Sequence, residues 1–320
     1  MGSGSVRILY VTVVSPLVAV TGANGFVGRA FCARAMASGR NVRRLVRRPD
    51  GDAVAVDLAR AADRELAQAL ADVAVVVHLA GRAHVGGETD ARFDDAYHAA
   101  NTHATQRLAA HAVTCGVRRF VFASTVKVNG EATRPDRPFR PTDPPAPQDA
   151  YARSKLAAEQ ALVDVARDSA MAVTVLRLPL VYGAGVKGNL RTLIDAVGER
   201  RWLPVGAIDN RRSLLGLDNL LDALDAVIDA SVAPTGVHFV ADAASVSTPA
   251  LVRAIARALG VAPRIVPVPV PLLRIAAALT GRRAAIDRLA GSLEVDCASL
   301  TAASAWVPRA FAIDAASVAR

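Results

Sequence analysis

The sequence is poor in cysteine and has no metal-ligand pattern. Its three cysteines, Cys32, Cys115 and Cys297, are odd in number and widely separated, and none belongs to a CxxC motif. These features exclude a disulfide framework and a structural zinc site, and they favour a reducing compartment. The six histidines form no ligand arrangement with cysteines or carboxylates. We therefore expect no metal.

Aromatic residues are also scarce, at 4% of the chain. The formal net charge of +9 could suit nucleic acid, but the arginines are dispersed and no stacking aromatics accompany them. We therefore expect no nucleic-acid partner.

Long apolar runs are missing as well. The stretch from Ile8 to Val20 is interrupted by Ser15-Pro16 and is too short to span a bilayer, so we expect no membrane partner. If this stretch were a secretory signal, its removal would destroy the glycine motif that follows. The sequence thus predicts a cytoplasmic protein whose first 16 residues are a leader of uncertain structure.

The chain does contain a regular alternation of apolar strands and alanine-rich helices, and 52% of its residues are hydrophobic. This pattern predicts an α/β fold, a Rossmann-type doubly wound parallel sheet covered on both faces. Residues 17–180 would form an NAD(P)-binding Rossmann domain. Residues 181–320 would be mainly a smaller C-terminal α/β substrate lobe that could return to the sheet near 237–241. The predicted strands are 17–21, 41–46, 73–80, 118–124 and 172–178, and the predicted helices are about 26–38, 61–71, 91–115 and 150–169.

The first predicted strand runs into TGANGFVG (21–28), which opens the first predicted helix. Glycines at this spacing permit a tight turn and close approach to a pyrophosphate, and the helix N-terminus offers free amides and a positive dipole end. The position of the motif between an apolar strand and a helix favours a dinucleotide site over a plain structural turn. The expected contact residues are Gly22, Asn24, Gly25, Phe26, Val27 and Gly28.

Arg47 and Arg48 stand at the end of the second predicted strand, where an acidic residue would bind a free ribose 2′-hydroxyl. Two cations suit a 2′-phosphate instead, so NADP is favoured over NAD. The alternative is that they are two more arginines in an arginine-rich chain. Asp57, followed by Leu58, is the candidate partner for the adenine edge.

A tyrosine and a lysine lie four residues apart in YARSK (151–155), in a chain with four tyrosines and three lysines. On a helix this spacing puts Tyr151 and Lys155 on one face. A lysine ammonium and an oxidised nicotinamide would stabilise the phenolate of a residue whose free pKa is about 10. With Ser124 at the end of a predicted strand, the pair would form a proton-transfer unit for alcohol–ketone interconversion. The alternative is a solvated helix start with one aromatic in a groove.

The set TGANGFVG, HLAG (78–81), Asn101, Ser124 and YARSK resembles the extended short-chain dehydrogenase/reductase superfamily over about residues 17–308. The resemblance implies that Tyr151 is the general acid/base and that Lys155 also holds the nicotinamide ribose. Ser124 would be the hydroxyl residue and Asn101 the helix asparagine. Further cofactor contacts implied by the resemblance are Leu79, Ala80, Gly81 and Pro179.

Within that superfamily, the second half is similar to the nucleotide-sugar epimerase, dehydratase and reductase group. This similarity implies a UDP-sugar substrate contacted by Thr125, by Asn189 at a helix start, and by the arginines Arg212 and Arg288 at the diphosphate. A departure is Val128-Asn129-Gly130, where these enzymes usually have Val-Tyr-Gly. The implied activity is 4-epimerisation or 4-keto reduction of a UDP-hexose or UDP-amino sugar for surface polysaccharides. A homodimer through the alanine-rich helices could accompany it.

Two other functions use the same residues. One is an NADPH-dependent reductase of a hydrophobic ketone, and the other is a non-catalytic NAD(P)-sensing regulator. An epimerase would retain its NAD, whereas a reductase would take NADPH from solution, and the sequence leaves both open.

Overall fold

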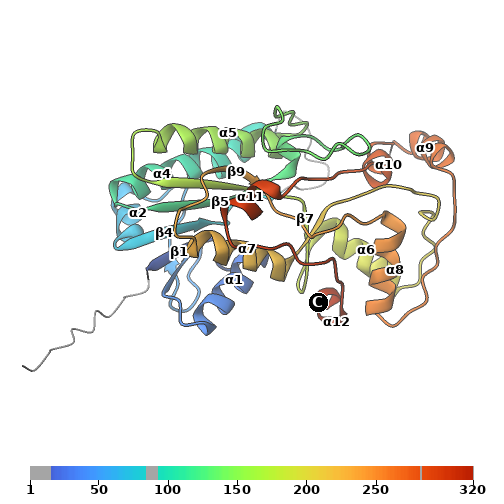
Figure 1. Ribbon diagram of the computed structural model, residues 1–320, viewed down its shortest axis with the longest axis horizontal. Helices are drawn as coiled ribbons and strands as arrows, with labels where there is room; N and C mark the ends of the chain where they lie inside the picture. Colours follow the sequence, from blue (N-terminus) through green and yellow to red (C-terminus); the bar gives the residue numbers. More distant parts are fainter. Residues whose placement is uncertain (1–15, 84–92, 282, 320) are drawn as a thin grey trace, which may run out of the picture.

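The computed structural model describes residues 16–83, 93–281 and 283–319, and its centre is a seven-stranded sheet (Figure 1). Every neighbouring pair of strands in this sheet is parallel, in the order β3-β2-β1-β4-β5-β6-β9. The predicted doubly wound parallel sheet is confirmed. The strands are β1 (Leu17–Thr21), β2 (Val42–Val46), β3 (Val54–Ala55), β4 (Val73–His78), β5 (Arg119–Thr125), β6 (Ala172–Leu178) and β9 (Gly236–Phe239).

Helices cover both faces of the sheet and bury two separate hydrophobic clusters. On one face pack α1 (Phe26–Ala37), α7 (Leu217–Asp229) and α11 (Ala298–Ala303). On the other pack α2 (Asp63–Leu70), α4 (Ala104–Thr114) and α5 (Ala150–Ala166). The strands are buried on both sides, which explains why they read as continuous apolar runs.

The predicted helix at 91–115 is not one regular helix. Its described part consists of α3 (Asp94–Tyr97), a π-helical segment η2 (His98–His103) and α4, and residues 91 and 92 lie outside the described residues. A π segment winds one extra residue into the helix, and such segments are frequent at functional sites. The prediction of one continuous helix did not include this segment.

Much of the chain after β6, apart from α7, β9 and α11, builds a second, smaller cluster beside the sheet. It contains the parallel pair β7 (Leu180–Tyr182) and β8 (Leu214–Gly216), together with α6 (Gly188–Gly198), α8 (Thr248–Ala258) and the short α12 (Ala315–Val318). The helices α9 (Val270–Leu279) and α10 (Arg283–Ala290) pack against each other at the end of this part that lies far from the sheet (Figure 1). The chain returns to the sheet at β9, so the two parts are interleaved.

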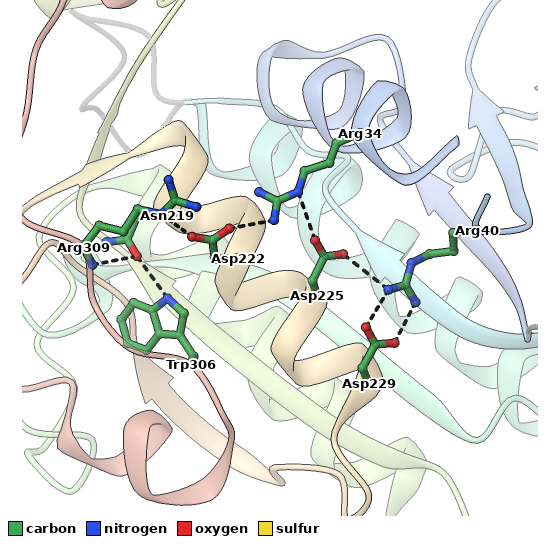
Figure 2. A network of polar contacts seen from close by, with 8 residues as sticks. All are labelled: Arg34, Arg40, Asn219, Asp222, Asp225, Asp229, Trp306 and Arg309. Carbon is green, nitrogen blue, oxygen red and sulfur yellow. Dashed lines mark hydrogen bonds and ion pairs between the residues drawn. The ribbon is translucent and has the colours of Figure 1, made fainter. Parts of the chain in front are cut away.

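Helix α7 carries a row of carboxylates that ties it to α1 (Figure 2). Asp222, Asp225 and Asp229 recur at helical spacing and face two arginines. The Arg34 guanidinium lies 2.7 Å from Asp222, and that of Arg40 lies 2.7 Å from Asp229. The row thus fastens a helix from late in the chain onto the first helix of the sheet.

The same face of α7 also anchors the C-terminal segment (Figure 2). The buried Trp306 donates from Nε1 to Asn219 Oδ1 at 3.0 Å, and Arg309 pairs with Asp222. This pairing of an indole donor with a buried amide satisfies both groups inside the core.

Across the described ranges, no helix combines the length and apolar character needed to cross a membrane.

Candidate active site

The turn between β1 and α1 lies against the end of β4. Gly22 has a positive φ of 65°, and a Cβ at this position would lie 2.8 Å from the Ala80 nitrogen. The Ala80 amide donates to Thr21 Oγ1 at 3.1 Å. Helix α1 then begins at Phe26 after Gly25, with no side chain capping its first amides. These amides can therefore bind an anion.

His78 supports this turn from inside the core. Its ring nitrogens lie 2.6 Å from Thr21 Oγ1 and 2.8 Å from Thr105 Oγ1, and the ring stacks on Phe122 at 5.4 Å. Burial, with a smaller effect of the Lys155 charge, lowers the pKa of His78 to about 3. His78 is therefore a neutral ring that links β1, β4 and α4.

Tyr151 and Lys155 lie in the first turns of α5. The helix is capped by Asp149, whose Oδ1 accepts the Ala152 amide at 2.7 Å. The Lys155 side chain is 5% exposed, and its ammonium lies 4.0 Å from the centroid of the Phe122 ring. Within the described ranges Lys155 has no hydrogen bond and no ion pair. Its three donors are thus available to a ligand.

The Lys155 side chain is held near the point where its charged and neutral forms are equally populated at neutral pH. Burial lowers the pKa of its ammonium to about 7, and the opposing effect of the Glu159 carboxylate is smaller. A ligand that accepts hydrogen bonds from the ammonium would favour its charged form.

The phenol of Tyr151 faces Thr125. Burial raises the pKa of Tyr151 to about 12, and a hydrogen bond with the Thr125 side chain acts in the opposite direction. The charges of Asp149 and Tyr97 contribute further, smaller increases in this pKa. A phenol in this setting needs nearby positive charge before it can serve as a base near neutral pH.

The Ser124 hydroxyl is directed elsewhere. Ser124 donates to Glu159, which forms a buried ion pair with Arg177 at 2.6 Å. Arg177 also donates to Asn129 at 2.8 Å, so the asparagine that departs from the Val-Tyr-Gly pattern is part of this network. Glu159 and Tyr151 both belong to α5, so two adjacent residues of β5 contact different side chains of that helix. The structure therefore brings Thr125, and not Ser124, to Tyr151.

Asn101 lies in the π segment and joins the end of β4 to α5. Its Oδ1 accepts the Arg82 amide at 2.7 Å, and its Nδ2 donates to Ser154 Oγ at 2.9 Å. A Cβ on Gly81 would lie 2.9 Å from Asn101 Oδ1. Asn101 therefore sets the course of the chain at residues 81 and 82, beside Lys155.

The two arginines expected near the ribose are exposed and unpaired in the described part of the chain. Arg47 and Arg48 follow β2 and have no hydrogen bond or ion pair there. Arg44 differs, because it pairs with Asp50 and Asp52. Only Arg47 and Arg48 of these three arginines are therefore free to meet an anionic group.

The remaining predicted cofactor residues lie around the same edge of the sheet. Asp57 follows β3, and its Oδ1 accepts the Ala59 amide at 3.1 Å. Pro179 is buried directly after β6. Asn24 is exposed, whereas Phe26, Val27 and Leu58 each pack against a hydrophobic cluster.

Arg212 and Arg288 meet in the second part of the molecule. Arg212 Nη1 donates to the carbonyl oxygens of Arg288, at 2.7 Å, and Gly291, at 3.0 Å. Burial lowers the pKa of Arg212, against the smaller effect of the Glu131 charge. The exposed Arg288 guanidinium lies 3.6 Å from Glu131. Asn189 is exposed in the first turn of α6.

Lys127 is a charged residue near the site that sequence reasoning missed. It follows β5 in a short 3₁₀ turn, η3 (Val126–Val128), and its ammonium lies 2.5 Å from Asp149 and 3.0 Å from Glu131. The available signal was its rarity as one of three lysines.

Among the described residues, no three histidine, cysteine or carboxylate side chains form a group that could hold a metal ion.

Comparison with known proteins gives concordant matches. The model of the NAD dependent epimerase/dehydratase family matches residues 18–241. UDP-glucose 4-epimerase of Vibrio cholerae is 38% identical over 298 residues, which are 91% of this chain and 90% of the relative. The dTDP-6-deoxy-L-talose 4-dehydrogenase (NAD(P)(+)) of Kitasatospora kifunensis is 34% identical over 235 residues, 68% of this chain and 71% of the relative.

Among solved structures, MoeE5 in complex with UDP-glucose and NAD is 27% identical, with a TM-score of 0.71. The match covers 92% of this chain and 94% of MoeE5. The similarity therefore extends through both the sheet and the second part of the molecule.

Proposed function

Since the chain belongs to the NAD dependent epimerase/dehydratase family, we propose that it is an NAD(P)-dependent oxidoreductase acting at C4 of a UDP-sugar. The observation that carries this proposal is the placement of Thr125, Tyr151 and Lys155 next to the β1–α1 turn, with a Lys155 ammonium that has no hydrogen bond or ion pair among the described residues. A phenol beside an ammonium suits proton transfer, and the turn suits a pyrophosphate.

In this proposal the bound nicotinamide supplies hydride transfer, and the protein handles the proton. Tyr151 takes the proton from the C4 hydroxyl as a phenolate and returns it as a phenol in the reverse step. Thr125 hydrogen-bonds with the same phenol and orients it toward the substrate. The Lys155 ammonium favours the phenolate and donates to the ribose of the cofactor.

The assignment of the hydroxyl role to Thr125 revises the role expected for Ser124. The contact of Ser124 with Glu159 supports a structural role for Ser124. Asn101 is a positioning residue in this proposal, because it contacts the chain at residue 82 and Ser154.

The substrate proposal rests on the two arginines and on the relatives. Arg212 is held by two carbonyl groups, and Arg288 is exposed beside it, so both could pair with a diphosphate. The Vibrio cholerae relative is named a UDP-glucose 4-epimerase, and MoeE5 binds UDP-glucose, which supports UDP as the nucleotide. We place the reaction in the supply of sugars for surface polysaccharides.

Epimerisation is the first candidate, because of the name of the 38% identical relative. Reduction of a 4-keto sugar by NADPH is the second, because Arg47 and Arg48 follow β2 and have no partner in the described part of the chain, a placement that favours NADP over NAD. The two differ in whether the cofactor leaves the protein during turnover.

The test is the nucleotide content and activity of the purified protein. Retained NAD and interconversion of UDP-glucose and UDP-galactose without added cofactor would support epimerisation. An empty protein that oxidises NADPH with a 4-keto UDP-sugar would support reduction. The proposal fails if UDP neither binds in calorimetry nor raises the melting temperature. Arg212→Ala should weaken UDP binding and leave NAD(P) binding unchanged.

A further inference from the structure

Lys127 occupies the space between the end of β5 and the start of α5. Its ammonium lies 2.5 Å from Asp149 Oδ2 and 3.0 Å from Glu131 Oε1. Its side chain is 22% exposed and that of Asp149 is 4% exposed. An ion pair this enclosed interacts far more strongly than one on the surface.

Asp149 is fixed close to the phenol. It precedes Tyr151 by two residues, and its Oδ1 accepts the Ala152 amide at 2.7 Å as the cap of α5. The capping bond requires an acceptor at this position, so the carboxylate stays where its charge opposes formation of the phenolate. In agreement, the Asp149 charge raises the pKa of Tyr151.

We propose that Lys127 is a positioning residue for the reaction, which acts through Asp149. Its ammonium offsets the charge of the carboxylate that caps the catalytic helix, so that this carboxylate opposes proton loss from Tyr151 less strongly. The inference rests on the proposed function in one respect, the role of Tyr151 as acid/base. It adds a second lysine to the site, beside Lys155.

Glu131, the second carboxylate that contacts Lys127, also lies near the Arg288 guanidinium. Glu131 Oε2 lies 3.6 Å from the Arg288 guanidinium, so Lys127 does not have to balance two carboxylates alone. Loss of Lys127 would therefore remove the ammonium that pairs with Asp149, two residues before Tyr151.

Other charged or titratable groups also surround Tyr151, and they stay the same in the variants below. Lys155 lies one turn along α5, and Tyr97 of α3 packs edge-on at a centroid distance of 6.1 Å. Arg82 lies over the Tyr97 ring at 5.2 Å, and Arg153 pairs with Asp94 at 2.7 Å. A difference between wild type and a Lys127 variant therefore reports on Lys127.

The first measurement is the pH profile of kcat/KM for Lys127→Gln. We expect the apparent pKa of the Tyr151 step to rise by about one unit, the size of shift that a close charge produces. In the oxidative direction, the rate below that pKa would fall about tenfold, because the phenolate fraction falls by the same factor. Lys127→Arg keeps the charge and should restore the profile; a shift equal to that of Lys127→Gln would overturn the proposal.

A double-mutant cycle tests the route through Asp149. Asp149→Asn can still cap the helix but carries no charge. We expect Lys127→Gln to shift the profile in the wild-type background and to have little effect in the Asp149→Asn background. A full shift in both backgrounds would mean that Lys127 acts directly, and the proposal would be wrong. Thermal melts show which variants are folded. If Lys127→Gln alone does not fold, the comparison is between Asp149→Asn and the double variant Lys127→Gln/Asp149→Asn, whose pH profiles should be nearly the same.

A direct titration of the phenol separates this inference from the proposed function. In protein labelled with ¹³C at the tyrosine ring and saturated with NAD⁺, the Tyr151 signal is identified by its loss in Tyr151→Phe. Its pKa should be higher in Lys127→Gln than in wild type, whether or not UDP-sugars are substrates. An unchanged Tyr151 pKa would overturn the inference, while failure of UDP-sugar turnover alone would overturn only the proposed function.

Discussion

The Thr125 side chain, at the end of β5, shares a hydrogen bond with the Tyr151 phenol near the start of α5. Ser124, one residue earlier on the same strand, donates to Glu159 instead. The two hydroxyls therefore contact different side chains of α5: Thr125 meets the proposed acid/base, and Ser124 meets a carboxylate in a buried ion pair. This division gives the two residues separable effects.

Thr125→Val should lower kcat by about 100-fold, because it removes the hydroxyl that orients the phenol and keeps the side-chain shape. Thr125 Oγ1 also accepts the Lys127 amide at 3.3 Å, so the change should cost about 1 kcal/mol of unfolding free energy. Ser124→Ala is the matched variant. It removes a buried hydrogen bond to a charged group and should cost about 1.5–3 kcal/mol of unfolding free energy, with a smaller loss of kcat. Steady-state kinetics and urea unfolding of both variants check this pair, and the reverse pattern would contradict the assignment.

Gly22→Ala should abolish dinucleotide binding. A Cβ at Gly22 would lie 2.8 Å from the Ala80 nitrogen, so the end of β4 would have to move. Gly39→Ala is the control, since Gly39 also has a positive φ, of 77°, but among the described residues none beyond its chain neighbours lies within 4 Å of the added carbon. Both changes should cost about 1–2 kcal/mol of backbone strain. Only the first should remove NAD(P) binding in calorimetry, and equal binding by both variants would argue against a cofactor site at this turn.

Replacing Arg47 and Arg48 with glutamine should reveal the cofactor preference. Both side chains are exposed and unpaired among the described residues, so their loss should leave stability unchanged. If they meet a 2′-phosphate, the Kd for NADP should rise about tenfold, the value of one charge-assisted hydrogen bond, while the Kd for NAD stays constant. Arg44→Gln, which removes an arginine already paired with Asp50 and Asp52, is the comparison. Equal effects on NAD and NADP would remove the argument for NADP.

Acid should destabilise the protein in part through His78. The folded pKa is about 3, lowered from 6.5 by burial, so the unfolded chain binds a proton first as the pH falls. The stability due to the neutral ring is therefore complete above about pH 6.5 and is lost progressively toward pH 3. His78→Gln should be less stable at pH 7 but should lose less stability between pH 6.5 and 4. Urea midpoints across this range measure the difference, and parallel curves would contradict it.

Much of the fold followed from local patterns. The strands 17–21 and 172–178 were predicted with the observed ends, and α1 and α5 within three residues, because apolar runs and helix breakers are local features. The π segment around Asn101 was not predictable, since it depends on how the helix packs against residue 82 and Ser154 rather than on its own periodicity.

The sequence by itself determined that a glycine turn follows the first strand and that Tyr151 and Lys155 share one face of a helix, because both depend on spacing along the chain. Only the tertiary structure decided which of two adjacent hydroxyls meets the phenol, since Ser124 and Thr125 both contact side chains of α5 and the packing pairs one with Glu159 and the other with Tyr151. It also decided that Lys127 pairs with Asp149, 22 residues away, because such a contact arises only when the strand end and the helix start are brought together.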